Sequence, residues 1–165
     1  MEEIQVEIRS AVKQDVPTIL RFISELAAYE HLEEEVVATE ALLQEWIFVK
    51  KKAEILLAEI AGKPVGFALF FHNFSTFLGR SGIYLEDLYV LPEARGRGVG
   101  TMLLQRLAAI ALERGCGRLE WSCLDWNRPS IAFYRSLGAC PMKDWTVYRL
   151  SGETLSALAG RKTGK

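Results

Sequence analysis

The stretch YLEDLYVLPEARGRGVG, Tyr84–Gly100, constrains the structure of this chain more than any other segment. Its first half is rich in aromatic and aliphatic residues that favour a β-strand, and Pro92 ends that strand. Three glycines at alternate positions then lead into the apolar helical run TMLLQRLAAIALERG, 101–115. The first turn of a helix leaves backbone N–H groups unpaired, and residues without side chains let a bulky anion approach them. The stretch therefore predicts a strand, a turn that binds phosphate, and a helix.

The glycine spacing does not match two common phosphate-binding motifs. A dinucleotide fingerprint needs a third glycine where Thr101 stands, and a P-loop needs a Gly-Lys-Ser/Thr sequence that is absent. The spacing that is present is Arg95-x-x-Gly98-x-Gly100. An ordinary glycine-rich turn between a strand and a helix remains the alternative.

Length and composition favour one globular domain covering residues 1–165. The net charge of −1 provides no overall attraction to nucleic acid or to an anionic membrane, so we expect neither as a partner. The three cysteines, Cys116, Cys123 and Cys140, have no metal-ligand spacing, so no metal site is expected. The absence of a signal-like apolar region and of any run of 18 apolar residues points to a cytoplasmic protein.

Hydrophobic periodicity predicts an α/β chain (α+β mixed sheet) in the order strand, two helices, three strands, helix, strand, helix, strand and short helix. Asp15, Thr39 and Asn127 are the expected helix caps. The segment HNFSTFLGRSG, 72–82, is predicted to be a loop. The expected strands are 4–8, 54–60, 65–72, 84–91, 118–124 and 145–150, and the expected helices are 15–29, 39–47, 98–114, 127–137 and 152–159.

Five motifs in order give the chain a family resemblance. They are LAAYE with a following EE, STFLGR, YLED, LDWN and FYRSLGA, beginning at Leu26, Ser75, Tyr84, Leu124 and Phe133. Together with the glycine loop they resemble the diamine (spermidine/spermine) acetyltransferases of the GNAT superfamily, and most of all their thialysine acetyltransferase branch. The resemblance implies the GNAT-type acyl-CoA N-acyltransferase fold with a splayed central pair of parallel strands, acetyl-CoA as donor, and a homodimer.

The resemblance also implies where acetyl-CoA binds. The loop would hold its pyrophosphate, the free backbone at the end of the strand would bind the pantetheine arm and the acetyl carbonyl, and a later helix would complete the site. For Arg97 a solvated surface position is an equally open alternative. The implied cofactor-binding residues are Leu88, Tyr89, Val90, Arg95, Gly96, Arg97, Gly98, Val99, Gly100, Asn127, Ser130 and Tyr134.

Tyr134 is the residue that we expect to act as general acid. It follows Asn127 by seven residues, nearly two helical turns, so both lie on one face of the predicted helix. A tyrosine hydroxyl with a pKa of about 10 can protonate a departing thiolate. The alternative is that Tyr134 packs in the core.

Glu86 is the expected base that takes a proton from the protonated amine, directly or through water. Its neighbour Asp87 should point to the other face of the strand because side chains alternate, so the two carboxylates should not act as a pair. Both, together with Glu30, are expected to bind the substrate amine. Glu86 could instead only anchor the substrate, and Glu30 could belong to an ordinary solvated acidic face.

The function that follows is acetyl-CoA-dependent N-acetylation of a primary amine on a small molecule, by direct transfer in a ternary complex. The acceptor would be a diamine, a polyamine or a lysine-like amino acid such as thialysine. Ser75 and Phe77 replace an Asp and a Trp of the polyamine-acetylating members, so the donor is better supported than the acceptor. The alternatives are a protein or peptide N-acetyltransferase and a non-catalytic module that senses acyl-CoA.

Overall fold

A computed structural model describes residues 3–161, which form two compact units that divide between Leu124 and Asp125. The first unit contains all the strands, in a single mixed sheet with the order β1-β2-β3-β4-β5. Its elements are β1 Val6–Ser10, α1 Val16–Tyr29, α2 Glu40–Leu43 with a π-helical extension Gln44–Val49, β2 Glu54–Ile60, β3 Lys63–Ser75, β4 Arg80–Val90, α3 Val99–Glu113 and β5 Leu119–Trp121. The second unit contains α4 Arg128–Ser136 and α5 Gly152–Leu158.

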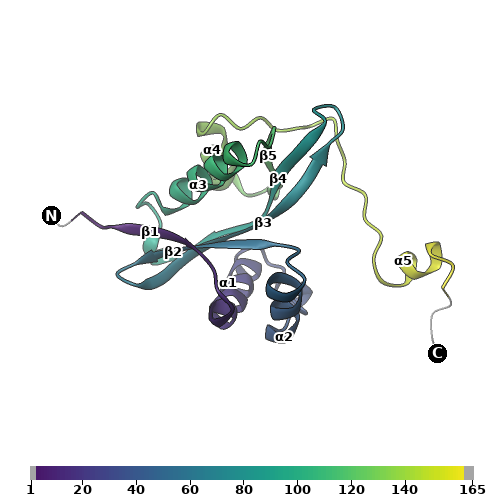
Figure 1. The fold of residues 1–165 in the computed structure, drawn as a ribbon, viewed down its shortest axis with the longest axis horizontal. Helices are drawn as coiled ribbons and strands as arrows, with labels where there is room; N and C mark the ends of the chain where they lie inside the picture. The colour runs from purple at the N-terminus through teal and green to yellow at the C-terminus, as the bar shows by residue number, and fades with distance from the viewer. Residues whose placement is uncertain (1–2, 162–165) are drawn as a thin grey trace. The chain divides into compact units, whose positions relative to one another are not determined.

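The sheet of the first unit lies between two layers of helix. Figure 1 shows α1 and α2 on one face of the sheet and α3 on the other. Strand β2 is buried on both faces: Ile55 and Leu57 pack with Phe22 and Ile19 of α1, while Leu56 and Ala58 alternate with them and are equally buried. This two-sided burial explains why β2 is a continuous apolar run rather than an alternating one.

The pairing within the sheet agrees with the predicted mixed topology. β1–β2, β2–β3 and β3–β4 are antiparallel, and β4–β5 is parallel. The connection between the two parallel strands is α3, as the predicted β-α-β half requires. This arrangement places the end of β4 directly before the glycine loop and the first turn of α3.

Two of the three predicted helix caps form as expected. The Thr39 hydroxyl accepts a hydrogen bond from the Leu42 N–H (3.2 Å), and the Asn127 side chain accepts one from the Ser130 N–H (3.4 Å). Asp15 stands at the start of α1, but its carboxylate accepts from the Val12 N–H and from Arg9 instead of from the helix. Asp15 therefore ties β1 to the turn before α1.

The predicted loop 72–82 is wrong, because β3 and β4 continue through it as one long hairpin. His72 pairs with Ile83 and Ser75 with Arg80, and only the four residues 76–79 turn the chain. The buried Ser75 hydroxyl accepts from the Leu78 N–H, and its carbonyl accepts from the Gly79 N–H. Polar residues and Gly79 suggested a loop, but cross-strand pairing outweighs their weak local preference.

The last predicted strand, 145–150, does not form, since these residues have no helical or strand structure. Their sequence favours a strand, but a strand exists only where another backbone takes its hydrogen bonds. In the second helical segment Ile47 is buried, whereas Leu42 and Trp46 are about half exposed. Lys50 lies over the Trp46 ring instead.

Candidate active site

The candidate site begins where β4 and β5 separate. Parallel pairing joins Ile83–Leu85 to Leu119–Trp121 and stops there, while β4 continues to Val90 paired only with β3. The predicted splayed pair of parallel strands is therefore confirmed. Along Glu86–Val90 the edge of β4 that faces away from β3 has no strand partner in the described part of the chain. Backbone groups on that edge are available to a ligand, apart from the Val90 carbonyl, which accepts a hydrogen bond from Arg95.

Glu86 lies at a β-bulge in β4. Leu69 of β3 is opposite Asp87, and the next residue, Phe70, is opposite Leu85, so Glu86 is the extra residue. A bulge interrupts the regular alternation of side chains and redirects the residue that it adds. The prediction that Glu86 and Asp87 should not act as a pair assumed regular alternation of side chains along the strand. The bulge interrupts that alternation, so this reason for the prediction no longer applies.

Three carboxylates interact at this bulge. Burial, together with the charges of Glu86 and Glu30, raises the pKa of Asp87 from 3.8 to about 6. Burial also raises the pKa of Glu30, which follows the last turn of α1. Glu86 is exposed, whereas Asp87 and Glu30 are half-buried. The predicted substrate-binding residues Glu30, Glu86 and Asp87 thus form one electrostatically coupled group, which favours a cation in front of it.

The glycine loop has a backbone that suits an anion. Gly96 and Gly98 have φ angles of 77° and 80°, which residues with a side chain rarely adopt. A Cβ added at either glycine would meet nothing within 4 Å. Open space therefore lies in front of both residues. Gly98 caps α3, and its carbonyl accepts from the Met102 N–H (2.9 Å). The N–H groups of Val99, Gly100 and Thr101 consequently have no intrahelical acceptor.

The two arginines of the loop differ. Arg95 donates from Nε to the Val90 carbonyl (3.0 Å), and its guanidinium lies 5.4 Å from the ring centre of Tyr29 and 5.8 Å from that of Tyr89. It thereby joins the end of β4 to the end of α1. Arg97 is exposed, and no ion pair joins it to another residue within the described range. Of the two arginines predicted to bind phosphate, Arg95 therefore already contacts other protein groups, whereas Arg97 faces solvent.

Tyr29 is a residue that sequence reasoning gave no role. It lies on the last turn of α1 immediately before Glu30, and it stacks against Arg95. The sequence placed it only at the end of the predicted helix 15–29 and within the LAAYE motif. The contact connects the carboxylate group to the glycine loop through side chains, and it depends on the tertiary meeting of α1 and β4.

Asn127, Ser130 and Tyr134 belong to α4 in the second unit. Asn127 is buried, and Ser130 and Tyr134 are half-buried. The Tyr134 ring lies 5.5 Å from that of Phe133. The helix Arg128–Ser136 with Asn127 as its cap confirms that Asn127 and Tyr134 are nearly two turns apart on one helix.

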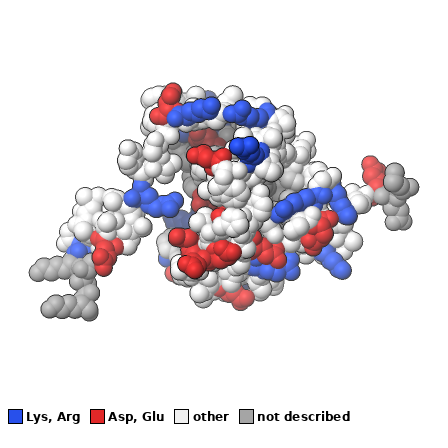
Figure 2. All heavy atoms as spheres, turned by 180° about the vertical axis from the view of Figure 1, so that it is seen from behind, with Lys and Arg blue, Asp and Glu red and all other residues white. Residues whose placement is uncertain are grey.

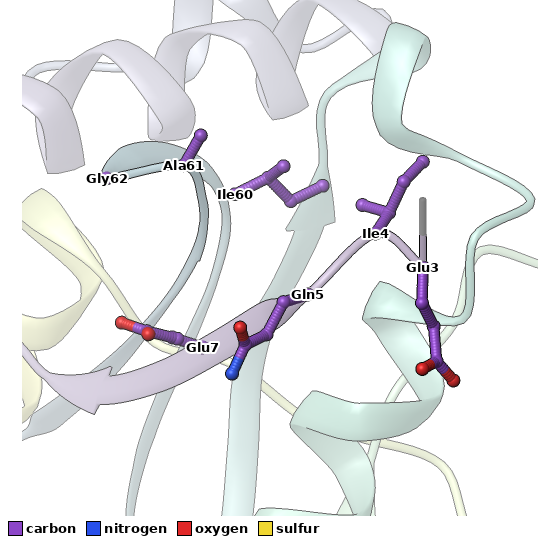
Figure 3. A pocket seen from close by; sticks show the side chains of 7 residues that line it. All are labelled: Glu3, Ile4, Gln5, Glu7, Ile60, Ala61 and Gly62. Atoms are coloured by element: carbon purple, nitrogen blue, oxygen red, sulfur yellow. The ribbon is translucent and has the colours of Figure 1, made fainter. Parts of the chain in front are cut away.

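One hollow on the surface of the first unit is lined by none of the predicted site residues. A hollow lined by Glu3, Ile4, Gln5, Glu7 and residues 60–62 lies at the start of β1 and the β2–β3 turn (Figure 3). Figure 2 shows acidic and basic side chains interspersed on one face of the molecule. Within residues 3–161 no cluster of three His, Cys, Asp or Glu could bind a metal ion, and no helix there is long and apolar enough to cross a bilayer.

Relatives with established names resemble the chain over nearly its full length. Thialysine N-epsilon-acetyltransferase from Bos taurus is 39% identical over an alignment that covers 94% of this chain and 98% of the relative. L-ornithine N5-acetyltransferase from Arabidopsis thaliana is 30% identical, covering 92% of this chain and 86% of the relative.

Solved structures share the fold. An integron cassette protein from V. cholerae superposes with a TM-score of 0.78 at 30% identity, covering 93% of this chain and 97% of that one. A ribosomal-protein-alanine N-acetyltransferase from Brucella melitensis superposes with a TM-score of 0.70 at 22% identity, covering 90% of this chain and all of that one, which shows the shared fold alone. The model of the Acetyltransferase (GNAT) family matches residues 19–139, which include β4, the glycine loop and α4. With the splayed parallel strands, the bulge and the glycine-capped helix, this match shows that the chain belongs to the GNAT family and is an acetyltransferase.

Proposed function

We propose that this chain transfers the acetyl group of acetyl-CoA to a primary amine of a small molecule, directly within a ternary complex. The acceptor would be a diamine or polyamine, or an amino acid with a side-chain amine such as thialysine or ornithine. The observation that supports this acceptor class most strongly is the near-full-length similarity to relatives named for thialysine and L-ornithine. The family match crosses the division at Leu124, which supports one functional domain spanning residues 1–165.

The residues around the glycine loop fit the donor. Open space before Gly96 and Gly98, with the free N–H groups of the first turn of α3, suits a pyrophosphate, and the exposed Arg97 adds a positive charge beside it. Acetyl-CoA supplies an activated thioester when it is bound. The unpaired edge of β4 from Leu88 to Val90 would donate and accept hydrogen bonds along the pantetheine arm. Asn127 and Ser130 would contact the donor from α4.

The three carboxylates Glu30, Glu86 and Asp87 would together bind the acceptor amine and remove its proton. An alkylamine has a pKa near 10.4 and is protonated at neutral pH, whereas only its neutral form is nucleophilic. Glu86, exposed at the bulge, would take that proton directly or through water. Asp87 and Glu30, whose pKa values are raised by burial, would gain a favourable partner when a cationic amine enters. Tyr134 would donate the proton that the departing thiolate needs.

Two further expectations belong to this proposal. The resemblance implies that the protein acts as a homodimer. A cytoplasmic location would agree with Cys116, Cys123 and Cys140, none of which forms a disulfide in the structure.

One experiment tests the reaction and its acceptor together. The protein is incubated with acetyl-CoA and, separately, thialysine, ornithine, spermidine and a lysine peptide, while free thiol release is followed. We expect turnover with at least one small amine and little with the peptide. Preference for the peptide would favour protein acetylation, and silence across the panel with tight acetyl-CoA binding would favour a sensor.

The role of Glu86 has its own measurement. If Glu86 is the base, Glu86→Gln should lower kcat and remove the ionisation that Glu86 contributes to the pH–rate profile. If Glu86 only anchors the amine, the variant should raise KM for the amine and leave the shape of the profile unchanged. Glu33→Gln, at an exposed position of the same acidic segment, is the matched control and should change neither.

A further inference from the structure

Two hydroxyl groups meet where the parallel strands β4 and β5 part. The ladder between these strands is only three residues long, with Ile83–Leu85 against Leu119–Trp121. Immediately past its last pair, the hydroxyl of Ser122 lies 2.6 Å from that of Tyr84, within the range of a hydroxyl–hydroxyl hydrogen bond. We call this contact the hydroxyl bridge. It stands at the point where the pairing ends and the open edge of β4 begins.

The register explains why these two residues reach each other. Tyr84 is paired with Glu120, and Ser122 lies two residues further along the chain, so it continues the face of the sheet on which Glu120 lies. Such a diagonal neighbour is too distant for short side chains but within reach of a long aromatic one. The phenol of Tyr84 therefore extends toward the open end of the strand pair.

The two ends of the hydroxyl bridge differ in how firmly they are held. Tyr84 belongs to β4 and pairs with Phe71 of β3, and the centres of the two rings are 5.3 Å apart. Ser122 belongs to no strand. The bridge thus secures the first residue after β5 to a side chain that the sheet already holds, two residues before the bulge at Glu86.

The closed end of the ladder has separate support. The Glu120 carboxylate accepts a hydrogen bond from the Asn73 amide (3.1 Å) and pairs with Arg118 Nε (2.8 Å). The Ile83 N–H donates to the Arg118 carbonyl (3.0 Å). None of these contacts involves the hydroxyl bridge. Loss of the bridge should therefore loosen the open end of the strand pair and leave the rest of the ladder paired.

We propose that Tyr84 and Ser122 are positioning residues for acetyl transfer, because the hydroxyl bridge fixes the point at which β4 and β5 part. On one side of that point lies the β4 edge Glu86–Val90, whose backbone is proposed to align the donor. On the other side the chain runs through residues 122–124 toward α4. The two hydroxyls act through the backbone that they hold. The inference rests on the acetyl-transfer function proposed above.

The size of the effect follows from the chemistry of one exposed hydrogen bond. A displacement of about 1 Å in a reacting group can cost roughly 100-fold in rate. The net contribution of a single hydrogen bond is smaller and corresponds to a factor of about 2 to 10 in an equilibrium. We therefore expect loss of the bridge to lower kcat by about 2- to 10-fold without abolishing the reaction.

Steady-state kinetics test the positioning role. The acceptor is whichever of thialysine, ornithine and spermidine the wild type acetylates fastest. Tyr84→Phe and Ser122→Ala should each lower kcat, while KM for acetyl-CoA changes little because the glycine loop is intact. The double variant should be no slower than the slower single variant, since either change already breaks the same bridge. Ser122→Thr keeps the hydroxyl and should retain the wild-type kcat.

Ser24→Ala is the matched control, because the Ser24 hydroxyl bonds only the Leu20 carbonyl of its own helix (3.0 Å). It should leave kcat unchanged. A slow Tyr84→Phe beside a normal Ser122→Ala would assign Tyr84 to another contact and overturn the bridge. Two slow single variants whose effects multiply in the double variant would overturn it as well.

Thiol labelling tests the bridge without any acetyl transfer. Cys123 follows Ser122 and is half-buried, whereas Cys140 is exposed and is therefore replaced by Ser. The rate at which a thiol reagent modifies Cys123 is read by peptide mass spectrometry. Tyr84→Phe and Ser122→Ala should both raise this rate by about 2- to 10-fold, because the segment after β5 opens more often. Ser122→Thr and Ser24→Ala should not, and an equal rate in all variants would overturn the bridge.

The two measurements separate this inference from the function on which it rests. If the wild type acetylates no amine but the labelling responds as expected, the acetyl-transfer proposal fails and the bridge still holds the segment after β5. If the wild type is active and neither kcat nor labelling responds, the inference is wrong and the acetyl-transfer proposal stands. Faster labelling with an unchanged kcat would overturn the positioning role.

Discussion

Asp87 provides a quantitative test of the carboxylate group at the bulge. Its folded-state pKa is raised from 3.8 to about 6, first by burial and then by the charges of Glu86 and Glu30. A carboxyl group whose pKa is raised by folding favours the folded state only while it is protonated. Its contribution is thus complete below pH 3.8 and is lost as the pH rises through 6. At neutral pH the ionised Asp87 therefore destabilises the empty protein.

Replacing Asp87 with Asn removes this cost without changing the shape of the side chain. A rise of about two pKa units corresponds to about 3 kcal/mol at pH values well above 6, as an order of magnitude. For a chain of this length that corresponds to an increase in Tm of roughly 6–12 °C. The advantage of Asp87→Asn should shrink as the pH falls from 7 towards 4, because wild-type Asp87 then becomes protonated.

Urea unfolding of wild type and variant between pH 4 and pH 8 measures the difference directly. Asp125→Asn, at an exposed aspartate, is the control and should give a small difference that does not depend on pH in this way. Glu86→Gln should lower the pKa of Asp87, because it removes one of the charges that raise it. A constant difference across the pH range, or an Asp87→Asn protein less stable than wild type at pH 8, would refute the electrostatic coupling.

Three further substitutions test other parts of the site. Tyr134→Phe should reduce kcat by about 100-fold or more, since general acid catalysis is lost, while KM for acetyl-CoA changes little. Steady-state kinetics measure both, with Tyr148→Phe as the control, and an unchanged kcat would exclude Tyr134 as the general acid. Arg97→Met should raise the Kd for acetyl-CoA and weaken the salt dependence of binding, with Tm unchanged. Arg95→Met should instead lower Tm, because Arg95 donates to the Val90 carbonyl and stacks on Tyr29 and Tyr89. Calorimetric titration and thermal unfolding distinguish the two variants, and identical behaviour would refute the distinction. Gly66→Ala should destabilise the protein by about 1–3 kcal/mol, because the added Cβ would lie 2.8 Å from the Tyr89 carbonyl oxygen. Gly62→Ala is the comparison, since its added Cβ would meet open space and cause only backbone strain. A Gly66→Ala protein as stable as wild type would contradict the predicted clash with Tyr89.

The local pattern of the chain determines most of the elements and the order in which they occur. The apolar run 54–60, the glycines before α3 and the Asn127 cap act over a few residues, so their consequences can be predicted without knowing what packs against them. The sequence also brings together in one stretch the strand end, the loop and the helix start that a donor phosphate needs. By itself it therefore determined the family, the mixed sheet and the location of the glycine loop.

Features that depend on a second backbone or on a distant charge follow from the folded arrangement of the chain. The bulge at Glu86 arises from the register between β3 and β4. The raised pKa of Asp87 arises first from its burial in the folded chain and then from the charges of Glu86 and of Glu30. The stacking of Arg95 depends on Tyr29 of α1. The strand predicted at 145–150 has residues that favour a strand, but a strand requires a partner, and no strand within residues 3–161 pairs with this segment. Strand pairing and electrostatic interactions act between residues far apart in the sequence. The local sequence pattern could therefore identify Glu86, Asp87 and Arg95 as candidate site residues, but it could not predict how they interact.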